Sequence, residues 1–291
     1  METLKPRPEL TALVNLLDEP DENAFSTVKE KLYYFGKEAL PFLEHARDDV
    51  FDSHVQERID QIIHKIQLDD ITAEFTNWVN TGSSDLLKGF MLVSRADNPL
   101  FEEDAITQEV EQIRMDAWLE LNDNLTVLEN VKVLNHILFQ VHNFDGNKVH
   151  PIAPENFYLP TLLNSRKGCA LSLGMLYLII AQKLNIPIVG VNLPQHFILA
   201  YLSEENTDQP TVDDVQFYIN PVNKGSVFTR REIELFINQL KVPADISYFA
   251  PCSNIDIIVR LLEDLIFIND QHNLQEKVND FKYLKKIIES I

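Results

Sequence analysis

Hydrophobic residues recur every three or four positions through the first half of the chain, which is the spacing of one face of an α-helix. Residues 55–66 show it clearly, because Val55, Ile59, Ile62 and Ile66 form one apolar stripe. Glycine, proline and polar clusters interrupt the pattern, Asp69-Asp70 among them, and mark helix ends. The predicted helices of this half are 9–17, 23–35, 38–47, 55–66, 71–79, 86–93, 103–121 and 126–141.

The pattern changes after Pro154. A helix is expected over 155–164, and residues 171–184 are apolar on almost every side, which indicates a helix buried within a core. Short β-type runs follow, and then more helices. The predicted strands are 188–191, 197–202 and 215–219, and the predicted helices are 229–240, 255–268 and 274–288. This order predicts a mostly helical α+β fold with a small antiparallel sheet.

The distribution of these elements suggests two domains. The four short amphipathic helices of residues 1–70 resemble HEAT-like helical hairpins, although no repeated motif accompanies them. Residues 71–291 would form the second domain. We expect a helical lead-in over 71–150, a core over 151–240 and C-terminal helices over 250–291, which either cover the core or form a dimer face.

Composition excludes several classes of function. Forty-five acidic residues against 25 basic ones give a net charge of −20, which disfavours binding to nucleic acid or to anionic membranes. The longest apolar stretch, near 170–181, is shorter than the roughly 20 residues that span a bilayer. The first residues lack the apolar segment of a signal peptide, and there are only two cysteines. We therefore expect a cytoplasmic protein.

No cofactor or metal site is expected. The chain has no Gly-x-Gly-x-x-Gly motif and no phosphate-binding loop. No two histidines lie four residues apart, as they would in a helical zinc motif.

Three residues could carry thiol chemistry. Cys169 precedes the buried helix, where the helix dipole and the neighbouring Arg166 and Lys167 would lower its thiol pKa. His196 opens the second predicted strand and Asn220 closes the third. Each has an ordinary alternative role, as a buried cysteine, a structural histidine and a turn residue.

Strand pairing decides whether the histidine and the asparagine meet. If Leu202 lies opposite Asp214 across the polar loop at 203–213, then His196 lies directly opposite Asn220. An asparagine beside a histidine orients the imidazole in Cys-His thiol sites. A slip of one residue would place the two side chains on opposite faces.

Several segments resemble the transglutaminase-like superfamily, specifically its bacterial SirB-type branch with a papain-like thiol fold. They are 166–177 (RKGCALSLGMLY), 190–201 (GVNLPQHFILAY) and 217–225 (FYINPVNKG), together with 135–139 and 143–147. The resemblance implies a cysteine nucleophile at the start of the core helix, a histidine base on the next strand and an aspartate on the strand after it.

His196 matches the histidine of this pattern, and Asn220 replaces the aspartate, as in papain-type sites. Aligning Ser172-Leu173 with catalytic relatives places their thiol at Ala170, so Cys169 stands one residue early. SirB-type relatives commonly carry Asn-Pro at positions 169 and 170. The same segments supply further residues expected to line a binding site, namely Arg166, Gly168, Ser172 and Gln195.

Three functions are compatible with these residues. The first is a catalytically degenerate module that binds a peptide or protein in the residual cleft. The second is a thiol enzyme that hydrolyses or transfers an acyl group at an amide bond, with Cys169 as nucleophile, His196 as base and Asn220 orienting it. The third is a helical scaffold whose cleft is vestigial. We favour the first, because the thiol is displaced and the aspartate is replaced; the oligomeric state stays open.

Overall fold

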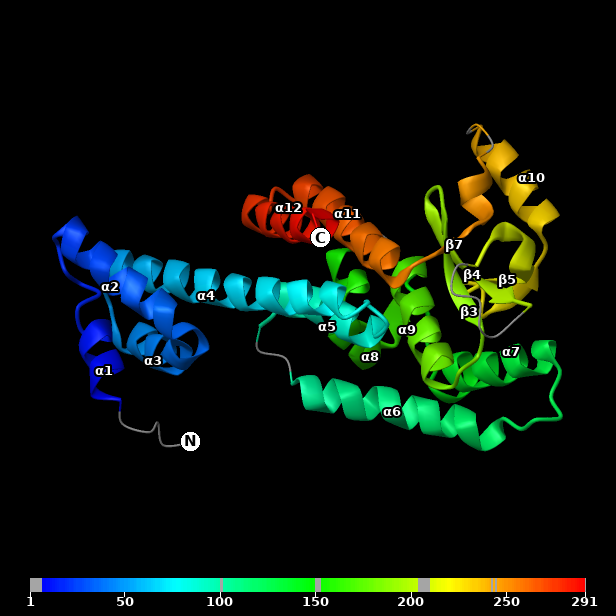
Figure 1. The fold of residues 1–291 in the computed structure, drawn as a ribbon, viewed down its shortest axis with the longest axis horizontal. Coiled ribbons are helices and arrows are strands. Elements are labelled where there is room, and N and C mark those ends of the chain that lie inside the picture. The colour runs from blue at the N-terminus through cyan, green and yellow to red at the C-terminus, as the bar shows by residue number, and fades with distance from the viewer. Residues whose placement is uncertain are drawn as a thin grey trace. The chain divides into compact units, whose positions relative to one another are not determined.

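A computed structural model describes residues 7–99, 102–149, 153–203, 210–241, 243 and 245–290. The chain divides into two compact units, Met1–Glu74 and Phe75–Ile291. The described part is mostly helical and contains a small antiparallel sheet (Figure 1), so the predicted α+β fold class is confirmed.

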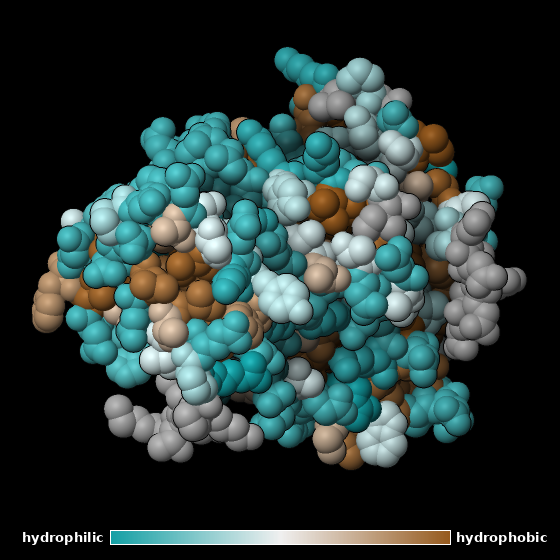
Figure 2. Space-filling model, turned by 60° about the vertical axis from the view of Figure 1, so that its left-hand side comes forward, coloured by the Kyte–Doolittle hydropathy of each residue, from teal (hydrophilic) through white to brown (hydrophobic). Residues whose placement is uncertain are grey.

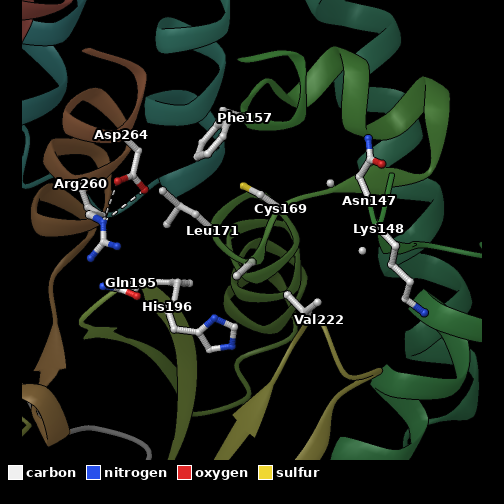
Figure 3. Close-up of a pocket in the computed structure, with 14 residues that line it drawn as sticks. Asn147, Lys148, Phe157, Cys169, Leu171, Gln195, His196, Val222, Arg260 and Asp264 are labelled. Carbon is white, nitrogen blue, oxygen red and sulfur yellow. Dashed lines mark hydrogen bonds and ion pairs between the residues drawn. The ribbon is translucent and has the colours of Figure 1, made fainter. Parts of the chain in front are cut away.

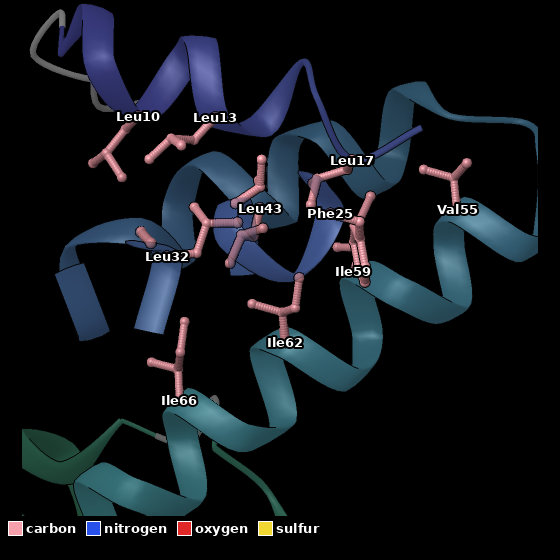
Figure 4. Close-up of a cluster of buried hydrophobic side chains, with 12 residues drawn as sticks. Leu10, Leu13, Leu17, Phe25, Leu32, Leu43, Val55, Ile59, Ile62 and Ile66 are labelled. Carbon is pink, nitrogen blue, oxygen red and sulfur yellow. The ribbon is translucent and has the colours of Figure 1, made fainter. Parts of the chain in front are cut away.

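The first unit is entirely helical in its described part. It contains α1 (Pro8–Val14), α2 (Glu22–Phe35), a 3₁₀ turn at Gly36–Ala39, α3 (Leu40–Asp49) and most of α4 (Ser53–Asn80). Buried aliphatic and aromatic side chains from all four helices form one core (Figure 4). Its labelled members are Leu10, Leu13, Leu17, Phe25, Leu32, Leu43, Val55, Ile59, Ile62 and Ile66. The predicted apolar stripe of 55–66 is thus the side of α4 that completes this core.

The predicted break between the helices 55–66 and 71–79 is wrong, because α4 is continuous from Ser53 to Asn80. Asp69 and Asp70 do not end the helix because each carboxylate has a cationic partner. Asp69 pairs with Lys65 one turn earlier, and Asp70 lies 2.7 Å from Nζ of Lys37. Paired acidic residues on a helix surface are compatible with helical geometry.

The second unit contains a five-stranded sheet in the order β6-β5-β4-β3-β7, with every neighbouring pair antiparallel. The strands are β3 (Ile188–Leu193), β4 (His196–Leu202), β5 (Val215–Asn220), β6 (Ser226–Phe228) and β7 (Pro251–Cys252). Sequence patterning predicts the three longer strands. It misses β6 and β7, which are too short to show an alternating pattern.

Helices cover both faces of this sheet. On one face, Phe197 and Leu199 of β4 approach Gly174 of α9 (Ala170–Lys183). Gly190 of β3 also contacts the Phe197 ring, so this aromatic side chain packs between two glycines. On the other face, residues of β3, β4 and β5 share a hydrophobic cluster with α10 (Arg230–Leu240) and the 3₁₀ turn Ile246–Phe249. The alternation of β4 side chains therefore assigns odd-numbered residues to α9 and even-numbered ones to α10.

The remaining helices surround this core. They are α5 (Leu86–Asp97), α6 (Glu103–Glu120), α7 (Val127–His136), α8 (Leu159–Ser165), α11 (Asn254–Gln271) and α12 (Gln275–Ser290), with a π-helical turn at Ile137–Val141 and 3₁₀ turns at Pro154–Phe157 and Val212–Asp214. Two further short strands, β1 (Asp145–Gly146) and β2 (Lys167–Gly168), pair in parallel. Capping boxes at Thr126 and Thr229 begin α7 and α10, where the helices 126–141 and 229–240 were predicted to start.

The predicted helix over 155–164 is split into a 3₁₀ turn and α8 on either side of Tyr158. Proline explains the interruption, because Pro160 has no N–H to donate to the carbonyl of Asn156 four residues earlier. That carbonyl instead accepts a hydrogen bond from Oγ of Ser172 at 2.6 Å. The break therefore frees a buried acceptor at the place where α9 begins.

Hydrophilic side chains cover much of the face drawn in Figure 2, and hydrophobic ones gather in smaller patches. Within the described residues, every helix is too short or too polar to cross a bilayer.

Candidate functional site

A cavity of about 420 Å³ lies in the second unit at the start of α9 (Figure 3). Its walls come from residues 146–148, the beginning of α9, the turn between β3 and β4, and one side of α11. Four of the predicted site residues line it, namely Gly168, Cys169, Gln195 and His196. Ser172 is fully buried and does not line the cavity, and neither does Asn220, whose side chain is hydrogen-bonded to His196.

Cys169 is the N-cap of α9. Its sulfur accepts a hydrogen bond from the backbone N–H of Ser172 at 3.4 Å, and its own N–H donates to Oγ of Ser172 at 3.1 Å. This is a capping box with a thiol in the place of the usual hydroxyl. Because Ser172 is itself held by the Asn156 carbonyl, the direction of the thiol is determined by the helix start.

The pKa of the Cys169 thiol is raised, in contrast to the lowered value expected from the sequence. Burial is the main cause, and the carboxylate of Asp264 adds to it. Hydrogen bonds from Ser172 and from the Leu171 backbone act in the opposite direction without overcoming burial.

The expected cationic neighbours do not face the sulfur. Arg166 lies 2.6 Å from Glu109 and stacks over the ring of Phe144, with 4.9 Å between the guanidinium carbon and the ring centroid. Lys167 lies 3.5 Å from Asp145. Arg166 is also absent from the described lining of the cavity.

His196 belongs to the even-numbered side of β4, and its ring lies 6.1 Å from that of Phe236 on α10. Burial lowers the pKa of His196, and the positive charge of Arg260 lowers it further. A side-chain hydrogen bond with Asn220 acts in the opposite direction. Since this bond favours the protonated ring, the imidazole donates and the amide oxygen of Asn220 accepts.

The predicted register between β4 and β5 is wrong, although the two side chains still share a face. Leu202 lies opposite Val215 rather than Asp214, and a bulge follows, so that Leu199 lies opposite Ile219. The pairing near the site is therefore displaced by two residues from the predicted one. Because strand side chains alternate with a period of two, this even displacement keeps Asn220 on the same side as His196.

Oδ1 of Asn220 also accepts hydrogen bonds from the backbone N–H groups of Val222, at 3.1 Å, and Asn223, at 3.2 Å. These bonds fix the amide at the start of the following turn. Asn135 of α7 holds the other end of this turn, because its Nδ2 donates to the Gly225 carbonyl at 2.8 Å and its Oδ1 accepts from the Tyr177 hydroxyl at 3.1 Å. Asn135 is a positioning residue that the sequence pattern did not single out.

Cys169 and His196 share a cavity but not a hydrogen bond, as far as the described contacts extend. Figure 3 shows the sulfur directed toward Phe157 and away from the imidazole. The arrangement lacks the thiol-to-base contact that activates a cysteine nucleophile.

Three charged residues of the cavity were not predicted, namely Lys148, Arg260 and Asp264. Arg260 and Asp264 lie one turn apart on α11, and Nε of Arg260 lies 3.2 Å from each carboxylate oxygen of Asp264. Their spacing along the helix was visible in the sequence. The tertiary contact that brings α11 to the start of α9 was not. Within the described chain, no group of three or more potential metal ligands is present.

The chain belongs to the transglutaminase-like superfamily, whose family model matches residues 104–263, more than half of the sequence. The match contains the start of α9 and all the described lining residues of the cavity except Asp264. No solved structure matches the chain.

Among named relatives, F-box only protein 21 of Mus musculus is 32% identical over 107 residues, which is 36% of this chain and 17% of that protein. The UPF0162 protein of Vibrio cholerae is 23% identical over 159 residues, covering 55% of this chain and 56% of that protein. A UPF0162 protein of Pseudomonas aeruginosa is 23% identical over 182 residues, covering 62% and 63%. The chain thus spans less than two thirds of the length of each.

The lowered pKa of His196 predicts a specific pH dependence of stability. At a pH between the lowered pKa of His196 in the folded protein and its pKa of about 6.5 in the unfolded chain, the unfolded state binds a proton that the folded state does not. The free energy of unfolding should therefore fall as the pH drops through this window, and His196→Gln should reduce the fall. Urea unfolding at about pH 7.5 and about pH 5.5 measures the difference. His45→Gln, at an exposed histidine, serves as the control. If the free energy of unfolding falls between the two pH values by the same amount in both variants, the pH dependence does not come from His196.

Proposed function

We propose that this chain is a transglutaminase-like module that has lost thiol chemistry and binds a peptide or protein in the remaining cavity. The observation that carries the proposal is the role of Cys169 as a helix cap, with a raised pKa and no contact to the imidazole. A sulfur used in this way is neither ionised nor aimed at an acyl carbon.

Binding is supported by the cavity itself. Its volume is within the range of pockets that hold small ligands or one or two side chains of a peptide. Apolar groups such as Phe157, Leu171 and Val222 alternate in its wall with the polar groups of Gln195 and Arg260. That mixture suits a peptide, which presents both kinds of group.

The alternative is a thiol enzyme that acts on an amide bond. It is favoured by one observation, the presence of Cys169 and His196 in a single cavity with Asn220 bonded to the imidazole. It requires the sulfur to turn toward His196, which would break the cap on α9.

We also propose that the chain belongs to the SirB-type branch, that residues 1–70 form a domain of their own, and that the protein is cytoplasmic. Both cysteines are free, which supports a reducing compartment.

The experiment that separates the module from the enzyme is the pH dependence of iodoacetamide alkylation, read peptide by peptide with mass spectrometry. We expect Cys169 of the folded protein to react more slowly than the same cysteine in urea, because burial raises its pKa. Cys252, whose pKa is raised to about 12 by burial, should behave in the same way.

A matched control moves the thiol by one residue. In Cys169→Ser/Ala170→Cys, serine keeps the N-cap and the thiol stands at the first residue of α9, which also lines the cavity. We expect this thiol to react faster than Cys169. If Cys169 itself reacts with an apparent pKa below about 8.5, and His196→Ala removes that reactivity, the enzyme reading replaces the module.

A further inference from the structure

The charge of the cavity differs from that of the chain around it. The whole chain carries a net charge of −20, yet the described lining of the cavity contains two cations, Lys148 and Arg260, and one carboxylate, Asp264. The start of α9, a helix of 14 residues, contributes the positive end of its dipole to the same space. An anionic group is therefore favoured here although the rest of the chain repels it.

Arg260 is a cation of the cavity whose terminal nitrogens have unused hydrogen-bonding capacity. Its side chain is only 23% exposed, and its Nε is engaged by both oxygens of Asp264. Within the described residues, its two terminal nitrogens have no hydrogen bond or ion pair. A side chain that is mostly buried, with Nε held and the fork of its two terminal nitrogens free, is suited to a planar carboxylate with two parallel N–H···O bonds.

Asp264 orients the guanidinium of Arg260 for such a partner. Because it holds Nε from one turn further along α11, it restricts the rotation of the guanidinium before any ligand arrives. In Figure 3 the terminal nitrogens of Arg260 are turned away from Asp264 and toward Gln195.

The turn between β3 and β4 brings a further polar side chain to this end of the cavity. Gln195 has a φ of +59° in the tight turn between β3 and β4, a left-handed conformation that a glutamine rarely adopts. The strained turn places an amide side chain in the cavity lining next to His196.

We infer that the fork of Arg260 receives a carboxylate of the bound peptide, with Gln195 beside it and the apolar wall of the cavity holding the adjoining side chain. The inference rests on the proposed function and names the chemistry of its ligand. The carboxylate belongs either to the C-terminus of the peptide or to an aspartate or glutamate side chain.

Three hexapeptide pools test this, each randomised over neutral residues and N-acetylated. The first has a free C-terminal carboxylate, the second has an amidated C-terminus and one fixed glutamate, and the third is amidated with glutamine in place of that glutamate. Equilibrium dialysis against the full chain, with mass spectrometry of the retained peptides, gives the retention of each pool. We expect one of the two carboxylate pools to be retained about tenfold more than the third. The reason is that a carboxylate can form two charge-assisted hydrogen bonds with the terminal nitrogens of Arg260, whereas a neutral amide cannot.

Arg260→Gln should reduce that retention to the level of the third pool. Arg114→Gln is the matched control, since Arg114 is 24% exposed, pairs with Glu111 on α6 and lies outside the described lining of the cavity. If Arg260→Gln melts below Arg114→Gln, Arg260→Lys takes its place. It keeps the charge beside Asp264 but not the fork, and should lose most of the preference.

The outcomes separate the inference from the proposed function. Retention of all three pools to the same extent would leave peptide binding in place and overturn the role of the carboxylate. Retention of none would overturn both. Preference for the first pool assigns the C-terminus as ligand, and preference for the second assigns an acidic side chain. An unchanged preference in the Arg260 variants would remove Arg260 from the site.

Discussion

Replacing Gly174 by valine is expected to lower the free energy of unfolding of the second unit by more than about 3 kcal/mol. A Cβ at this position would lie 2.6 Å from Cδ1 of Phe197 and 2.7 Å from Cε1. The ring has little room to move away, because on its other side a Cβ added at Gly190 would likewise lie 2.8 Å from Cζ, so the ring already occupies the space that this glycine leaves. Urea unfolding followed by circular dichroism measures the loss.

Alanine at the same position gives the sharper comparison. In an exposed helix, alanine is about 1 kcal/mol more favourable than glycine, so helix propensity alone predicts stabilisation. We expect Gly174→Ala to destabilise instead. Phe197→Val removes the ring atoms responsible, and Gly174→Ala should cost less in that background than in the wild type. Additive costs in the double variant would contradict the contact, as would a gain from Gly174→Ala alone.

Replacing Gly225 by alanine is expected to cost about 3 kcal/mol. Gly225 has a φ of +70°, which any side chain makes unfavourable, and a Cβ there would overlap the carboxamide of Asn135. The substitution therefore adds backbone strain and breaks the hydrogen bond from Asn135 to the Gly225 carbonyl.

Gly36→Ala separates these two contributions. Gly36 has a φ of +54° but no atom within 4 Å of a Cβ, so only backbone strain, of about 1–3 kcal/mol, applies. Chemical unfolding of both variants gives the difference, which we assign to the loss of the Asn135 contact. Equal losses would show that this contact does not stabilise the turn.

Gly174 and Gly225 matter for the site as well as for stability. Phe197 directly follows His196 on β4, and the turn that Gly225 closes begins at Asn220. A displaced Phe197 ring or a loosened turn would move the imidazole and its hydrogen-bond partner together. We therefore expect either substitution, at Gly174 or at Gly225, to reduce peptide retention by more than the Arg114→Gln control does.

Local patterns explain which parts of this fold were predictable. Helical periodicity and the helix starts at Thr126 and Thr229 depend on neighbours within a few residues, and both were predicted correctly. The false break in α4 came from treating adjacent acidic residues as a stop, whereas their partners Lys37 and Lys65 are supplied by the fold.

The site was less predictable because its chemistry depends on distant contacts. The bulge next to Leu202 shifts the strand register, and no local sequence feature of β4 announces it. The pKa of Cys169 was expected to fall, since Arg166 and Lys167 are close in sequence, but both side chains have carboxylate partners elsewhere. Burial then determines the direction of the shift. Arg260 enters the cavity from a helix nearly a hundred residues further along the chain, so no spacing rule reaches it.

The thiol cap on α9 has an evolutionary consequence. If position 169 serves the helix start, selection acts there on the ability to accept a hydrogen bond from the N–H of Ser172, not on nucleophilicity. Serine, threonine, aspartate and asparagine should then be interchangeable with Cys169, whereas alanine should not. An Asn-Pro pair at positions 169 and 170 would fit the same rule, since asparagine is a strong N-cap and proline favours the first helical position, which Ala170 occupies here. A sequence lineage could thus exchange the cysteine freely while keeping both helix and cavity.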